Sequence, residues 1–164
     1  MTIALKVHPS FFKEFATKTW VSPADVIKEL IENAFDEDAT RVLITILSDN
    51  SISIEDNAGM DESEIQKFLL LGSPHKKVDS ISPKLKRVRT GRYGTGRLSF
   101  LTSFGKMKIR TRKGNYHKSF LIDTKSLDAL FTGKSNLHEI RETRLSRDGT
   151  EIIVSDAKSF VDEL

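Results

Sequence analysis

Three polar residues, Glu29, Asn33 and Asp36, lie at helical spacing in the segment that begins at Ser22 and Pro23. Positions i, i+4 and i+7 share one side of a helix, so a carboxylate, an amide and a second carboxylate would stand in line. Asn and Asp are unfavourable inside helices. Such oxygens suit Mg²⁺, and a carboxylate one turn away could hold and deprotonate water. The stripe is a candidate magnesium and water site; the alternative is the polar face of an ordinary surface helix.

Asp56 directly follows the expected strand 51–55, where its carboxylate can point into a pocket beside the sheet. A carboxylate accepts a hydrogen bond from an exocyclic amine, so it would favour adenine, with an amine at position 6, over guanine, with a carbonyl there. The alternative is an Asx turn that closes the strand. Asp56 alone does not decide between them.

A glycine-rich loop, Gly91–Arg97 (GRYGTGR), precedes an expected short helix over 96–104. Its glycines would let backbone N–H groups approach a polyphosphate, and a helix N-terminus adds positive potential. The spacing is not the dinucleotide-binding fingerprint, and a loop rather than a strand precedes it. The segment 133–135 resembles the end of a Walker A loop but lacks the first glycine. The loop is a candidate phosphate site, with a plain turn as the alternative.

The elements that must position these residues follow from periodicity and capping signals. Ser22 and Pro23 predict one helix start, and Asp61 with Glu64 predicts another. We expect helices over 23–37 and 61–71, strands over 40–48, 51–55, 106–112 and 116–123, and a last hairpin that pairs 137–144 with 149–155. This order indicates an α/β (α+β) fold, a two-layer sandwich of helices on a mixed, mostly antiparallel sheet.

Residues 1–20 form an N-terminal arm that carries Phe11, Phe12, Phe15 and Trp20. Ser10 could cap a short helix in this arm. We expect the helix to pack on the body of its own domain, and packing on a partner chain is the alternative.

Composition excludes several kinds of chemistry. The 164 residues are 38% hydrophobic and 30% charged, which is typical of one domain with its own core. The absence of Cys excludes disulfides, thiolate zinc sites and Cys nucleophiles. No apolar run approaches the roughly 20 residues that span a bilayer, and no secretory signal is visible. We therefore expect a cytoplasmic protein, or a nuclear one in a eukaryote, with no membrane partner.

Periodicity fails over 72–97, and such a long basic segment is typical of a lid or a binding loop. Eight Lys or Arg lie between His75 and Arg97, against the single acidic residue Asp79. They could bind a triphosphate, contact DNA or RNA over 76–97, or form a solvated surface loop. Tyr93 is the only aromatic residue there, so a stacking platform for single strands is poorly supported.

Taken together, five segments resemble, in order, the motifs of the GHKL superfamily of gyrase-, chaperone-, histidine-kinase- and MutL-type ATPases. They are Glu29–Asp36 as the N-box, Asp56–Met60 as the adenine box, Gly72–Lys76 as a lid element, Gly91–Gly96 as the glycine-rich box and Asp148–Thr150 as the closing Gly-Thr strand. Their order over about 22–154 is far more specific than any single motif. The resemblance implies one ATP-binding domain over 1–164 with the Bergerat-type fold and a lid over 72–97.

The resemblance also implies roles for individual residues. Glu29 would be the general base for the attacking water, and Asn33 the protein ligand of Mg²⁺ on the triphosphate of ATP. Asp56 would read the adenine amine, with support from Thr150. The other residues implied to contact the nucleotide are Asp36, Gly59, Met60, Lys76, Gly91, Gly94, Thr95, Gly96 and Arg97, with Gly94 and Gly96 offering backbone N–H groups.

Two features refine the resemblance. The second box is usually D-x-G-x-G, whereas Asp56–Met60 reads DNAGM and is either one residue short or lacks the first glycine. This leaves the loop geometry open. Glu29 and Asp36 resemble the MutL-, MORC- and chaperone-like ATPases more than histidine kinases. In those branches ATP closes a lid and drives homodimerisation, and hydrolysis is slow. Several take a phosphate-binding Lys from a following domain, so we expect this chain to be the N-terminal part of a longer protein.

Three functions follow as hypotheses. The first is Mg-dependent ATP binding with slow hydrolysis. The second is a non-catalytic module in which ATP gates the binding of a partner or DNA. The third is a histidine-kinase catalytic domain, against which the N-box argues.

Overall fold

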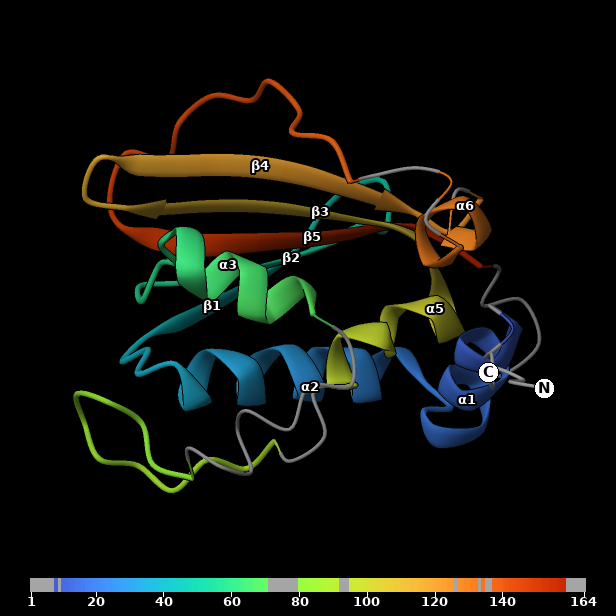
Figure 1. Cartoon of the computed structure of the whole chain (residues 1–164), viewed down its shortest axis with the longest axis horizontal. Helices are drawn as coiled ribbons and strands as arrows, with labels where there is room; N and C mark the ends of the chain where they lie inside the picture. The colour runs from blue at the N-terminus through green and yellow to red at the C-terminus, as the bar shows by residue number, and fades with distance from the viewer. Residues whose placement is uncertain are drawn as a thin grey trace, which may run out of the picture.

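The computed structural model places a five-stranded sheet against a layer of helices (Figure 1). It describes residues 8, 10–70, 80–91, 95–125, 127–132, 134 and 137–158. The helices α2 (Pro23–Asp36), α3 (Glu62–Leu69) and α5 (Phe100–Ser103) lie along one face of the sheet. The expected sandwich of helices on a sheet is confirmed, and every strand pair in these ranges is antiparallel.

The main helices begin where their capping residues predict. Ser22 and Asp25 form a capping box at the start of α2, and Asp61 and Glu64 form another at the start of α3. The other helical pieces among the described residues are α1 (Ser10–Thr19), the 3-10 turn η1 (Gly96–Leu98) and α6 (Leu127–Phe131). The single helix expected over 96–104 is therefore two short pieces, η1 and α5, and α6 was not expected.

Two hairpins and one inserted strand make the sheet, in the order β1-β2-β5-β3-β4. The strands are β1 (Val42–Ile46), β2 (Ile52–Asp56), β3 (Phe104–Lys113), β4 (Tyr116–Asp123) and β5 (Gly149–Ala157). The expected hairpins β1–β2 and β3–β4 are confirmed. The expected pairing of 137–144 with 149–155 is wrong, because β5 pairs with β2 and β3 instead.

The segment 137–148 crosses the side of the sheet away from the helices (Figure 1). Its charges there match those of the strands. Glu142 pairs with Lys108 of β3 at 3.2 Å, and Glu139 pairs with Lys118 of β4 at 2.6 Å. Strand β5 has mostly alternating buried residues and fills the central place in the sheet. Ion pairs, together with a hydrogen bond from the Ile140 N–H to the Ser119 carbonyl oxygen at 2.9 Å, thus hold 137–148 on β3 and β4. The alternating buried residues of β5 suit its central place in the sheet.

The core lies between the sheet and the helices. Val26 and Leu30 of α2 belong to the same buried cluster as Ile109 of β3. The N-terminal arm joins this cluster through Ala16 and Trp20, so α1 packs on its own chain, as expected. Helix α1 and Trp20 therefore contribute to the hydrophobic core of the domain.

Two glycines let the loop after β2 lie directly against its neighbours. Gly59 has a φ of +69°, and a Cβ there would overlap the carbonyl oxygen of Arg112. A Cβ at Gly149 would overlap the carbonyl oxygen of Asp56. Only glycine permits such an approach at these angles. The backbone around Asp56 is thus locked to β3 and β5.

Gly59→Ala should destabilise the domain far more than Gly114→Ala. Both glycines have positive φ, which costs an alanine about 1–2 kcal/mol. A Cβ at Gly114 meets nothing within 4 Å, whereas at Gly59 it meets backbone. We expect Gly59→Ala to lower the free energy of unfolding, measured by chemical denaturation, by more than about 4 kcal/mol. Equal losses for the two variants would contradict the role of the close approach.

Candidate functional site

A cavity of about 540 Å³ lies among α2, α3 and the end of β2. Six of the predicted site residues line it, namely Asn33, Asp56, Gly59, Met60, Arg97 and Thr150. The described part of the predicted lid contributes Ser80, Ile81, Pro83 and Arg89. The volume falls within the range of small-molecule sites in proteins.

A polar row runs across three strands beside this cavity. The register places Asp56 opposite Thr150 and Thr150 opposite Thr111, so the three side chains share one face of the sheet. The hydroxyls of Thr111 and Thr150 lie 3.2 Å apart, and Thr111 Oγ1 accepts a hydrogen bond from the Met60 N–H at 2.7 Å. Sequence reasoning missed Thr111, although the alternation along β3 turns this polar residue towards the core.

The turn after Asp56 holds its carboxylate in place. The Ala58 N–H donates to Oδ1 of Asp56 at 2.8 Å. The side-chain oxygen of Asn57 accepts hydrogen bonds from the N–H groups of Thr40 and Arg41 at 2.9 and 3.0 Å. Burial raises the pKa of Asp56 above its usual value, against backbone hydrogen bonds that lower it. A defined loop therefore forms although the first glycine of the usual box is absent.

The residues of the polar stripe on α2 take different places. Asn33 lines the cavity. One carboxylate oxygen of Glu29 accepts a hydrogen bond from Trp20 Nε1 at 2.9 Å, and the other lies where a Cβ of Gly96 would stand. Glu29 is not part of the cavity wall. Its carboxylate instead lies directly against the glycine-rich loop.

Asp36, the last residue of α2, contacts the start of the glycine-rich loop. Its carboxylate is fully buried and accepts hydrogen bonds from the N–H groups of Thr90 and Gly91 at 2.8 and 3.0 Å. The Thr90 hydroxyl adds a third at 3.1 Å. The structure thus brings Asp36 and Gly91 together but gives Asp36 internal partners rather than a place on the cavity wall.

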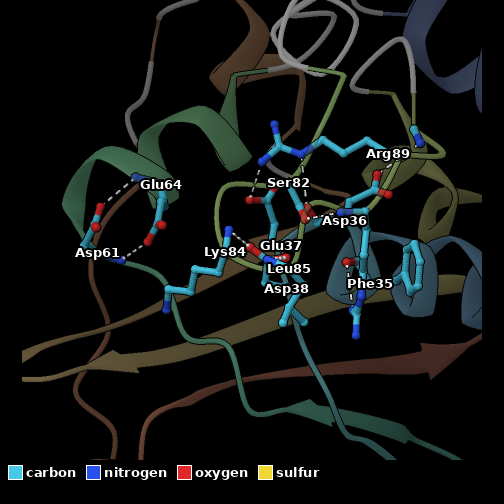
Figure 2. Close-up of polar contacts among 12 residues, drawn as sticks. Phe35, Asp36, Glu37, Asp38, Asp61, Glu64, Ser82, Lys84, Leu85 and Arg89 are labelled. Atoms are coloured by element: carbon cyan, nitrogen blue, oxygen red, sulfur yellow. Dashed lines mark hydrogen bonds and ion pairs between the residues drawn. The ribbon is translucent and has the colours of Figure 1, made fainter.

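Figure 2 shows how Glu37 and Asp38, which follow Asp36 in the chain, hold the segment 80–91. Asp38 accepts hydrogen bonds from the N–H groups of Lys84 and Leu85 at 2.8 and 3.1 Å. Burial acts to raise the pKa of Asp38, but these hydrogen bonds and one with Ser82 outweigh it and lower the pKa. The loop is therefore fastened by an ionised carboxylate.

Two arginines of this basic segment are used inside the domain. Arg89 pairs with Glu37 at 3.2 Å (Figure 2), and Arg87 donates to the carbonyl oxygen of Ala39 at 2.6 Å. Arg87 also lies 4.5 Å from the centre of the Phe35 ring. Phe35 is 41% exposed. Cations near a helix C-terminus are favoured by the helix dipole, so both arginines stabilise this end of α2.

Arg97 places a positive charge in the cavity wall. It is 4% exposed, and its Nη1 donates to the carbonyl oxygens of Lys67 and Leu70 at 3.0 and 3.3 Å. The guanidinium lies 5.0 Å from the centre of the Phe68 ring. Burial lowers the pKa of Arg97 to about 10, so it stays charged at neutral pH. Its Nε is buried without a hydrogen-bond partner among the described residues. A buried cation of this kind fits an anionic ligand.

Two of the predicted nucleotide contacts, Lys76 and Gly94, lie outside the described residues. Of the glycine-rich loop, the structure describes Gly91, Thr95, Gly96 and Arg97. Gly91 at one end of the loop contacts the buried carboxylate of Asp36, and Arg97 at the other end lies in the cavity wall.

The residues present fit a magnesium ion held mainly by its substrate. Within the described ranges, no group of three or more His, Cys, Asp or Glu side chains could hold a metal ion. Mg²⁺ commonly takes one or two protein ligands and completes its shell with phosphates and water. The amide oxygen of Asn33, on the cavity wall, suits that mode.

The cavity wall of this two-layer domain carries a half-buried carboxylate, an amide and a buried cation, a set of groups that suits a nucleotide ligand. A family model described as "Histidine kinase-, DNA gyrase B-, and HSP90-like ATPase" matches residues 21–151. The chain belongs to this family, and it is an ATP-binding domain of the GHKL ATPase superfamily.

Two curated relatives are similar to the chain. The "DNA mismatch repair protein MutL" of Aquifex aeolicus (strain VF5) is 32% identical over 94 residues, which are 56% of this chain and 22% of the relative. The protein of the same name from Aquifex pyrophilus is 33% identical over 94 residues, with the same shares. The match thus spans less than a quarter of each relative. None of the helices in the described ranges has the length and apolar character of a membrane span.

Asp56→Asn should weaken ATP binding without weakening the fold. Hydrogen bonds to charged groups contribute about 1.5–3 kcal/mol, so calorimetry should show roughly 10- to 100-fold lower affinity. Because burial raises the pKa of Asp56 in the folded state, its ionisation reduces stability as pH rises through that pKa. The variant should therefore melt at the same or a higher temperature at neutral pH, and this difference should shrink in acid.

The matched control is Glu55→Gln, at the preceding position of β2. Glu55 pairs with Arg147 on the outer side of the sheet, away from the cavity. This control should bind ATP like the wild type. Equal ATP affinity for Asp56→Asn and the wild type would contradict the assignment of Asp56.

Proposed function

We propose that this domain binds Mg-ATP in the cavity and hydrolyses it slowly to ADP and phosphate. The observation that carries the proposal is the half-buried carboxylate of Asp56 on the same cavity wall as Asn33 and Arg97. The carboxylate of Asp56 suits the adenine amine, the amide of Asn33 suits a cation, and the guanidinium of Arg97 suits phosphate oxygens. Family membership supports the choice of ATP as the ligand.

At the adenine end, Asp56 accepts a hydrogen bond from the exocyclic amine. Thr150 supports this contact directly or through a water molecule, and Thr111 fixes the Thr150 hydroxyl. Gly59 and Met60 form the adjoining cavity wall.

At the phosphate end, backbone N–H groups of Gly94, Thr95 and Gly96 bind the triphosphate, whereas the Gly91 N–H donates to Asp36 and positions the loop. Arg97 adds a positive charge from the cavity wall, and Lys76 adds another from the lid. Asn33 ligates Mg²⁺, which neutralises phosphate charge when bound. Asp36 acts in this arrangement through Thr90 and Gly91, which it holds in place.

Glu29 is the general base of the proposed hydrolysis. Water attacks the γ-phosphorus, and Glu29 accepts the proton that the water loses. The bond between the γ-phosphorus and the bridging oxygen breaks, and its electron pair stays on ADP. Such transfer depends mainly on positioning and electrostatics, and a slow rate follows if the phosphates lack further cations from a following domain.

We also propose that ATP closes the lid over 72–97 and drives homodimerisation, as in the branches that the sequence resembles. Lys84 and Lys86 are exposed in the described part of the lid. DNA or RNA is a proposed partner of 76–97, and the names of the two relatives support DNA. Ultracentrifugation with a non-hydrolysable ATP analogue tests the dimer.

One observation favours a second candidate, an ATP-gated binding module without turnover. Glu29 lies off the cavity wall and already accepts a hydrogen bond from Trp20. In that case the purified chain would bind Mg-ATP tightly and show no hydrolysis above background.

Glu29→Ala should lower the hydrolysis rate about 100-fold or more, since general bases typically contribute 10²–10⁴. ATP affinity should stay within twofold of the wild type, because Glu29 acts on water and not on the nucleotide. Glu32→Ala is the matched control, since Glu32 lies on the same helix in a loose surface pair with Lys28 at 3.9 Å. Full hydrolysis by Glu29→Ala would overturn the base assignment.

Arg97→Met should weaken binding of ATP and ADP about 10-fold or more, because hydrogen bonds to charged groups contribute about 1.5–3 kcal/mol. Adenosine, which has no phosphate, should bind both proteins alike. Arg89→Met is the control, since Arg89 also lines the cavity but its charge pairs with Glu37. If Arg97→Met weakened adenosine binding equally, Arg97 would act on the shape of the cavity and not on phosphate.

A further inference from the structure

Trp20 contacts Glu29 from the end of the N-terminal arm. The indole Nε1 donates a hydrogen bond to Oε1 of Glu29 at 2.9 Å. Trp20 is 6% exposed, so this hydrogen bond is shielded from solvent on the indole side. None of the five sequence motifs includes Trp20, and the proposed function gives it no part.

The second oxygen of Glu29 faces the glycine-rich loop. Oε2 lies so close to the α-carbon of Gly96 that a Cβ there would overlap it. The carboxylate is therefore held between an indole N–H on one side and loop backbone on the other. A carboxylate with one oxygen committed to a donor can rotate less, which leaves the other oxygen in one defined place.

The indole is itself fixed by the core. The Thr102 hydroxyl donates to the Trp20 carbonyl oxygen at 3.1 Å, and the Trp20 N–H donates to the Ala16 carbonyl oxygen at 2.9 Å. The ring of Phe15 meets the indole edge-on, with centres 5.9 Å apart. The donor to Glu29 thus stands on rigid structure, which is what an orienting group requires.

We propose that Trp20 is a positioning residue that orients Glu29 for proton transfer. The inference rests on the proposed function, because it gives Glu29 an orienting partner as the general base. The indole N–H keeps Oε1 occupied throughout, and Oε2 receives the proton of the attacking water. In many hydrolases a third group forms a hydrogen bond with the general base and orients it. Here the third group comes from the N-terminal arm.

Trp20→Phe keeps an aromatic ring and removes the N–H. Misplacement of a reacting group by about 1 Å can cost 100-fold in rate, so we expect kcat for Mg-ATP to fall roughly 10- to 100-fold. KM and the affinity for ATP should stay within twofold, because Trp20 does not line the cavity. Phe15→Leu is the matched control, since it loosens the same arm without touching Glu29, and its kcat should stay within twofold.

A purely structural role would give a different pattern. Trp20→Phe and Phe15→Leu would then lower kcat and melting temperature together, and that result would overturn the proposal. A double-mutant cycle provides a second test. In a Glu29→Gln background, Trp20→Phe should cause no further loss of turnover, whereas a full additional loss would overturn the proposal.

Fluorescence tests the contact without any turnover, because Trp20 is the sole tryptophan. Glu29→Ala should shift its emission in the nucleotide-free chain, and Glu32→Ala should not. An unshifted spectrum for Glu29→Ala would overturn the contact. The two proposals fail separately: full activity of Glu29→Ala rejects the base, whereas full activity of Trp20→Phe with an inactive Glu29→Ala rejects only the positioning role. No turnover by the wild-type chain would reject both.

Discussion

The hydrogen bonds that the buried carboxylate of Asp36 accepts fix how helix α2 and the glycine-rich loop lie relative to each other. This carboxylate lies at the end of α2 and accepts hydrogen bonds from Thr90 and Gly91, so the helix and the glycine-rich loop are joined. Glu29 lies on the same helix and rests against Gly96 of the same loop. A buried charge is tolerated only where donors satisfy it, and here the donors that satisfy it are the backbone of the loop itself.

The half-buried carboxylate of Asp56 lies on the cavity wall, unlike that of Asp36. Its Oδ1 accepts one short hydrogen bond from the Ala58 N–H, and burial raises its pKa above the usual value. Such a group is costly to the fold and gains from a ligand that donates to it, which is why perturbed pKa values gather at functional sites. The carboxylate of Asp36 thus joins parts of the site, and the proposed function gives the carboxylate of Asp56 to the bound nucleotide.

Local signals in the sequence predicted those parts of the structure that depend on neighbouring residues. The starts of α2 and α3 need only the four residues of a capping box, and the two hairpins need only their turns and alternation. The place of β5 depends on β2 and β3, both distant in the chain, so adjacency wrongly favoured a pairing with 137–144. The order of the motifs predicted that Asn33, Asp56 and Thr150 share a cavity. The burial of the Asp36 side chain and the contact between Thr111 and Thr150 depend on tertiary packing. The spacing of residues along one helix or strand does not predict such packing.

The central position of β5 also governs when the cavity can exist during synthesis. The cavity wall needs Asp56 and Thr150 side by side, and these two residues leave the ribosome far apart in time. Until β5 arrives, β2 has an open edge beside the apolar side chain of Ile54, and open edges of this kind pair readily with other chains. Pairing over such a long sequence separation is also slow. The nascent chain therefore passes through a stage in which its helix α2 and first hairpin can form but its nucleotide cavity cannot, and this stage is the one in which it is exposed to aggregation.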